Sequence, residues 1–156
     1  MVKEIVFDLD GSIVDFYSVP HWLEMLRAYD PTPYEVAEPM WDMRVLADTL
    51  KELQTLGVVI SIVTWLSKES TPAYDEVVRE TKKEWLDRYD FPYDHFHGVK
   101  YGATKANSVR KRLHDGDEAI LIDDNAKVRE GWHLGATIDP TAENIIEVLK
   151  KLLEEN

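Results

Sequence analysis

The chain has 156 residues, of which 44% are hydrophobic and 31% charged, a composition typical of a folded globular protein and not of a disordered or fibrous one. Its formal net charge of −12 disfavours a general nucleic-acid binder, because the phosphate backbone would be repelled. It contains no cysteine, which excludes disulfides, thiolate catalysis and cysteine-ligated zinc. No apolar run is long enough to cross a bilayer, and the first residues have the pattern of a strand and not of a signal peptide, so we expect a cytoplasmic protein.

Short apolar runs recur along the chain and are expected to form strands. The strongest candidates are 4–8, 58–64 and 119–122, and the weaker ones are 96–99 and 136–138. The strong runs are apolar without alternation, which is typical of strands that are buried on both faces of a sheet.

Helical periodicity fills the intervals between these runs. The apolar residues of 43–53 recur at intervals of three and four, as on one face of a helix. A second helix is expected to begin after Thr71, which can cap it. The predicted buried face of that helix carries Tyr74, Val77, Val78, Thr81, Trp85 and Tyr89. Thr104 is expected to cap a third helix, and Asp139-Pro140 to open the last one.

Strands separated by helices of this length predict βαβ units. The predicted fold class is therefore α/β, a Rossmann-like three-layer sandwich with a central parallel sheet, formed by a single domain over 1–156. The segment 16–40 interrupts the alternation, because one predicted helix (21–29) is followed there by three prolines. We expect this segment to be a small helical insertion that forms the only cap of the domain.

Polar residues follow the three strongest predicted strands. Asp8 and Asp10 follow the first strand, Thr64 ends the second, and Asp123 and Asp124 follow the third. Each motif alone has an ordinary explanation as a turn, a strand end or a helix cap. Ligands of parallel sheets bind beyond the carboxyl ends of the strands, so these side chains are expected to meet at one edge. Carboxylates gathered there would repel one another unless a cation lies among them, and oxygen ligands favour Mg²⁺.

The segments that carry these residues are FDLDGSIVD (7–15), SIVT (61–64) and ILIDDN (120–125). They resemble the first, second and fourth motifs of the haloacid dehalogenase superfamily, with Ser12 where the first motif usually has threonine. The order Asp-x-Asp, Thr, Lys, Asp-Asp also matches, whereas a response-regulator receiver begins with its acidic pair and ends with its lysine. Within the superfamily, DLDGSIVDF, KKEWL (82–86) and LIDDN look most like the 5′(3′)-deoxyribonucleotidase branch.

This resemblance implies a Mg²⁺-dependent phosphatase. Asp8 would be the nucleophile that forms an aspartyl-phosphate, and Asp10 would be the general acid and base. The anionic neighbours of Asp10 are expected to raise its pKa, which suits an acid. The resemblance also implies that Mg²⁺ is held by the Asp8 carboxylate, the Asp10 carbonyl and Asp123, whereas Asp124 orients the site.

The resemblance implies that Thr64, the backbone N–H of Trp65 and one lysine bind the phosphate. Lys105 is the predicted lysine, because it opens the helix that leads to the third strong strand. Lys100 and Lys82 are the alternatives. The two lysines that do not bind phosphate are expected to be solvated.

The expected partner is a small phosphorylated substrate, for example a nucleoside monophosphate, with Trp65, Phe16 and Tyr17 as candidate walls of its pocket. A small cap leaves the site open, so a phosphatase of larger substrates, such as a phosphoprotein or a polynucleotide end, is the alternative. The acidic net charge argues against the polynucleotide, which needs a basic groove. A non-catalytic binding protein on the same fold is a further alternative. No membrane partner is expected, and the sequence carries no signal of an oligomeric state.

Overall fold

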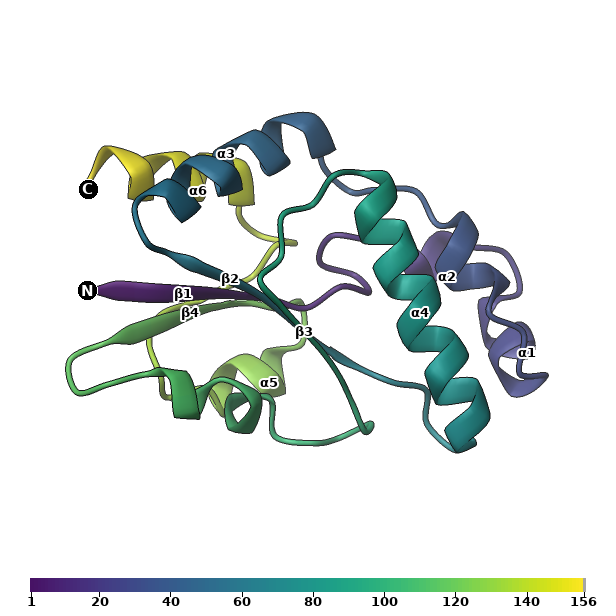
Figure 1. Ribbon diagram of the computed structural model, residues 1–156. Coiled ribbons are helices and arrows are strands. Elements are labelled where there is room, and N and C mark those ends of the chain that lie inside the picture. The colour runs from purple at the N-terminus through teal and green to yellow at the C-terminus, as the bar shows by residue number, and fades with distance from the viewer. Residues whose placement is uncertain (156) are drawn as a thin grey trace.

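The computed structural model describes residues 1–155, which are built around a sheet of five parallel strands (Figure 1). The strands are β1 (Val2–Phe7), β2 (Val59–Trp65), β3 (His95–Val99), β4 (Glu118–Ile122) and β5 (Thr137–Ile138). Their order in the sheet is β3-β2-β1-β4-β5. All the strands predicted from the sequence are present, and all neighbouring strands are parallel, as predicted.

Helices cover both faces of the sheet, so the predicted three-layer α/β architecture is confirmed (Figure 1). One face is covered by α3 (Met43–Thr55), α4 (Pro72–Arg88) and α6 (Ile145–Glu154). The other face is covered by two short 3₁₀ helices, η2 (Lys105–Ser108) and η3 (Arg110–Arg112), and by α5 (Ala126–Glu130). Every helix of the described part of the chain is too short or too polar to span a bilayer.

The central strands send alternate residues into two separate apolar cores. In β1, Ile5 and Phe7 pack into the core beneath α3, α4 and α6, whereas Val6 packs into the core on the opposite face. All three side chains are fully buried. Strands that must bury both faces need apolar residues at every position, which explains the uninterrupted runs in the sequence.

The start of α6 differs from the prediction. Asp139 does not open the helix, because its carboxylate accepts hydrogen bonds from the N–H and the hydroxyl of Thr141 and so closes a turn. Asn144 caps α6 instead, and its Oδ1 accepts the N–H of Ile146 at 3.0 Å. Both residue types satisfy the free N–H groups of a helix start, so the local sequence alone does not choose between them.

The helix expected after Thr104 is also different, since 105–112 forms the two 3₁₀ helices and the side chain of Thr104 makes no capping bond. Thr71, in contrast, caps α4 as predicted, with its Oγ1 accepting the N–H of Tyr74 at 3.1 Å.

The segment 16–40 forms a small helical insertion between β1 and α3, as predicted, and lies beside α4 (Figure 1). It contains η1 (Phe16–Ser18), α1 (Trp22–Arg27) and α2 (Thr32–Val36). The one helix expected over 21–29 is thus shorter and is followed by a second. Asp30 separates the two, because its Oδ1 accepts both the N–H and the hydroxyl of Thr32 and starts a new turn there.

The register of the central strands brings the carboxyl ends of β1 and β4 to one level, while β2 between β1 and β3 continues beyond it to Trp65. Phe7 in β1 is paired with Ile62 in β2 and with Ile122 in β4. The backbone N–H of Asp8 then donates to the carbonyl of Ile122 at 2.9 Å. The residues that follow these strands therefore emerge side by side at one edge of the sheet.

Candidate active site

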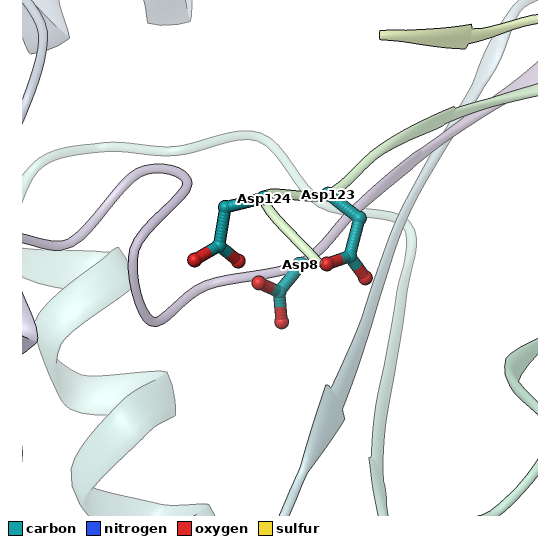
Figure 2. A group of neighbouring side chains, drawn as sticks. All are labelled: Asp8, Asp123 and Asp124. Atoms are coloured by element: carbon teal, nitrogen blue, oxygen red, sulfur yellow. The ribbon is translucent and has the colours of Figure 1, made fainter. Parts of the chain in front are cut away.

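Three carboxylates meet where β1 and β4 end (Figure 2). Oxygen atoms of Asp8, Asp123 and Asp124 all lie within 4.8 Å of one another. Asp8 and Asp123 are only 7% and 1% exposed, and Asp124 is half-buried. Carboxylates this close repel one another strongly when they are shielded from water. A donor set made of oxygens alone fits a hard divalent cation such as Mg²⁺, whose charge would remove the repulsion.

Ser12 and Gly11, in the segment that follows β1, determine how these carboxylates are arranged. The buried hydroxyl of Ser12 donates to Oδ2 of Asp8 at 3.0 Å and accepts the backbone N–H of Asp124 at 3.1 Å, so it links the ends of β1 and β4. Gly11 has a positive φ of 84°, and a Cβ at this position would overlap with Oδ2 of Asp124. Only glycine satisfies both requirements. The segment after β1 is therefore fitted to the acidic residues after β4.

Lys105 supplies a positive charge to the cluster. Its Nζ donates to Oδ1 of Asp8 at 3.0 Å and to Oδ2 of Asp123 at 2.8 Å, and the residue is 4% exposed. Burial by itself would lower the pKa of Lys105, but the charges and hydrogen bonds of Asp8 and Asp123 outweigh burial and raise the pKa above its ordinary value. The ammonium group therefore stays charged beside the predicted nucleophile.

Lys82 contradicts the expectation that it is solvated. It is 3% exposed, and its Nζ donates to Oγ1 of Thr64 at 2.8 Å, to the carbonyl of Trp65 at 3.0 Å and to Oδ2 of Asp10 at 3.3 Å. The ammonium group of Lys82 is thus hydrogen-bonded to three residues of the site. Lys100, the other alternative, is exposed.

The buried face of α4 explains why the sequence interpretation missed Lys82. That interpretation placed Val77 and Thr81 on the buried face, but Val77 is 45% exposed. The buried stripe runs through Tyr74, Val78 and Lys82 at intervals of four. A stripe of this spacing was visible in the sequence, but a lysine in it is ordinarily assumed to reach out to solvent.

Asp10 lines the cavity and pairs with Lys82. Burial raises the pKa of Asp10 above its ordinary value, against the opposing charge of Lys82, and the charge of Asp8 adds to the increase. The direction agrees with the expectation from the sequence. The main cause is burial rather than the anionic neighbours on which that expectation relied.

The predicted site residues line one cavity of about 600 Å³. The lining includes Asp8, Asp10, Thr64, Trp65, Lys105, Asp123 and Asp124. Lys82 and Lys100 are not part of the lining, although the three partners of Lys82 are. The structure thus brings together at one edge the residues that the sequence interpretation selected from three strand ends and one helix start.

Aromatic side chains form much of the remaining wall of the cavity. They are Phe16, Tyr17, Trp22, Tyr29 and Tyr34 from the insertion, and Trp65 and Tyr101 from outside it. Trp65 is held in place by a hydrogen bond from its Nε1 to the carbonyl of Ala103 at 2.9 Å. Of these aromatic residues, the sequence interpretation had selected Phe16, Tyr17 and Trp65.

The crowding of the carboxylates makes the metal-free protein sensitive to pH. Burial, followed by the charge of Asp8 and a hydrogen bond with it, raises the pKa of Asp124 from 3.8 to about 7. Between these two values the folded state holds a proton that the unfolded state has lost. This contribution to stability is complete below the lower value and is lost as the pH rises through the higher one.

We therefore expect the Tm of the metal-free protein to fall between about pH 4 and about pH 7, and to fall less steeply in Asp124→Asn, which has no proton to lose there. Thermal unfolding of both proteins in chelator, at several pH values, measures the difference. Parallel pH profiles of the two proteins would show that Asp124 is not protonated in the folded state.

The fold is similar to that of a phosphatase of known structure. The match to the crystal structure of D,D-heptose 1,7-bisphosphate phosphatase from Burkholderia thailandensis covers 86% of this chain and 74% of the phosphatase chain, with a TM-score of 0.52 and 15% sequence identity. At this identity the likeness shows a common fold. No protein-family model and no curated protein sequence matches the chain.

Proposed function

We propose that this protein is a phosphatase of the haloacid dehalogenase superfamily that hydrolyses phosphomonoesters with Mg²⁺ as its cofactor. One observation carries the proposal: Asp8, Asp10, Thr64, Lys105 and Asp123 line the same cavity beyond the carboxyl ends of the strands. The fold that the chain has in common with a sugar-phosphate phosphatase supports it. The proposal extends to a single domain over 1–156 with the segment 16–40 as its cap.

In the proposed reaction, a carboxylate oxygen of Asp8 attacks phosphorus while the bond from phosphorus to the leaving oxygen breaks. Asp10, whose raised pKa favours the protonated form, gives its proton to that oxygen. A water molecule then attacks phosphorus in the aspartyl-phosphate and passes a proton to Asp10, while the bond from phosphorus to the Asp8 oxygen breaks. This step regenerates the Asp8 carboxylate and releases inorganic phosphate. Lys105 and the hydroxyl of Thr64 balance the charge on the phosphoryl oxygens during both transfers.

The carboxylates of Asp8 and Asp123 would hold Mg²⁺, with the backbone carbonyl of Asp10. Asp124, whose oxygen lies within the same cluster, would orient the site or join these ligands. When bound, the ion neutralises the nucleophile and the phosphoryl group so that both can occupy one site.

The proposed substrate is a nucleoside monophosphate. A cavity of about 600 Å³ is large enough for a molecule of that size, and its lining includes aromatic side chains from the insertion and from β2. Aromatic side chains stack on planar rings without requiring one particular pattern of hydrogen bonds. Tyr17, which is exposed, and Trp65 both line the cavity and are the proposed contacts of the base.

A panel of phosphate esters, assayed with Mg²⁺, with Ca²⁺ and in chelator, tests this function. We expect turnover with Mg²⁺ only and the highest kcat/KM for nucleoside monophosphates. Ca²⁺ should bind but support little turnover, because its larger and looser coordination shell orients the reacting groups poorly. Mg²⁺ should also raise the Tm by binding only the folded state.

Each part of the proposal has its own contrary result in this panel. If the protein hydrolyses none of the esters, the proposed phosphatase activity is wrong. Full activity in excess chelator would overturn the role of the metal ion. If sugar phosphates or phosphopeptides are hydrolysed faster than nucleoside monophosphates, the proposed nucleotide substrate is wrong. A preference for phosphopeptides would favour a larger substrate.

A further inference from the structure

Lys82 is a buried cation in the middle of α4, and its side chain does not reach the cavity in which a phosphate would bind. An ammonium group in such a place is unfavourable unless its hydrogen-bonding capacity is satisfied. All three of its N–H bonds have a partner, namely Thr64, Trp65 and Asp10. All three partners line the cavity, whereas Lys82 does not. Lys82 can therefore influence a bound substrate only through the residues that it holds.

The contact with Thr64 determines which way its hydroxyl points. An ammonium group has only donors, so Oγ1 of Thr64 must accept from Lys82 at 2.8 Å. Within the described part of the chain, the hydrogen of this hydroxyl is not donated to any side chain or backbone group. Its single hydrogen is therefore free to point into the cavity, where a phosphoryl oxygen would accept it.

The contact with Asp10 fixes one oxygen of that carboxyl group. Lys82 donates to Oδ2 of Asp10 at 3.3 Å and leaves Oδ1 free to carry a proton. The Nζ atom also lies 5.0 Å from the centre of the Tyr34 ring, which belongs to the insertion and lines the cavity. One ammonium group thus joins residues from β2, the loop after β1 and the insertion.

We propose that Lys82 is a positioning residue that holds the Thr64 hydroxyl as a donor to the phosphoryl group and Oδ1 of Asp10 as the proton donor to the leaving oxygen. The inference rests on the proposed phosphatase function. In the step concerned, the bond from Asp8 to phosphorus forms, the bond to the leaving oxygen breaks, and the proton on Asp10 moves to that oxygen. If Lys82 only connected α4 to β2, removing it would affect all substrates alike.

The test compares two esters whose leaving groups differ in their need for a proton. p-Nitrophenol leaves readily as its anion, whereas the alkoxide of an alkyl phosphate needs protonation. The aryl ester is p-nitrophenyl phosphate, and the alkyl ester is the one that the wild-type protein hydrolyses fastest. In Lys82→Met we expect kcat/KM to fall by about tenfold for the aryl ester, through Thr64. For the alkyl ester we expect a fall of about 10²–10³-fold, because proton donation by Asp10 is also impaired.

The ratio of the two kcat/KM values is measured in one preparation and does not depend on how much of the variant is folded. Lys82→Gln, which keeps an N–H donor, should show a smaller change of this ratio. Lys83→Met is the matched control, because Lys83 is the next residue of α4 and pairs with Glu80 at the surface. In Lys82→Met/Thr64→Val, we expect the loss on the aryl ester to be no larger than in Thr64→Val alone, since the two residues act as a unit.

An equal fall for both esters, or no fall for either, would overturn the positioning role while leaving the phosphatase intact. The absence of hydrolysis of both esters by the wild-type protein would overturn the phosphatase and this inference with it. A change of the ratio in Lys83→Met as large as in Lys82→Met would attribute the effect to α4 as a whole and contradict the inference.

Discussion

Replacing Asp8 with asparagine is expected to lower kcat on a phosphate ester by about 10⁴–10⁶-fold, since loss of a covalent nucleophile removes the reaction path itself. The amide has the size of the carboxyl group, and its one oxygen can still accept from Lys105. Its NH₂ group then faces the hydroxyl of Ser12, which can accept from the amide and donate to Asp124 instead of position 8. The substitution also takes one negative charge out of a crowded cluster. We therefore expect a Tm close to that of the wild-type protein in chelator.

Phosphate release measures the change of kcat, and thermal unfolding measures the Tm. When turnover of an ester with a labelled phosphate is stopped with acid, we expect the label to remain bound to the wild-type protein and not to Asp8→Asn. Asp15→Asn is the matched control, because Asp15 lies on the same segment after β1 and does not line the cavity. An Asp8→Asn protein with a rate within tenfold of the wild-type rate would contradict the covalent mechanism.

Lys105→Met is expected to lower kcat by about 10²–10³-fold, as does the loss of a preorganised donor in other enzymes. It is also expected to destabilise the metal-free protein by about 3–5 kcal/mol, because the buried carboxylates of Asp8 and Asp123 lose their common cation. Mg²⁺ should restore part of this stability, since it brings positive charge to the same carboxylates.

Denaturant unfolding with and without Mg²⁺, together with kcat at saturating substrate, measures these effects. Lys100→Met is the control, and this exposed lysine should change neither quantity. A large loss of activity in Lys100→Met combined with a nearly normal Lys105→Met would transfer phosphate binding to Lys100.

The positions of the strands and the acidic residues that follow them could be predicted from the sequence. Apolar runs as short as 119–122 identify buried strands because burial on both faces requires apolar side chains at every position. A parallel sheet then aligns the carboxyl ends of its strands. Asp8, Thr64 and Asp123 were therefore expected to meet although the chain separates them widely, and all three line the cavity.

The start of α6 depended on tertiary packing. Asp139 and Asn144 are both good capping residues, so local chemistry offered two helix starts. The structure uses Asn144, and the helix that follows it buries Ile145 and Leu149 in the core beneath α3. Docking of the apolar face decided between two caps of similar local quality.

The sequence by itself determined the class of fold and the acidic edge of the sheet, because both follow from apolar burial and from the topology of parallel strands. Only the tertiary structure decided the place of Lys82, which sits 18 residues after Thr64 and 72 after Asp10 in the chain yet donates to both. A lysine is buried only where partners satisfy all its donors, and such partners become visible only when distant segments are packed together.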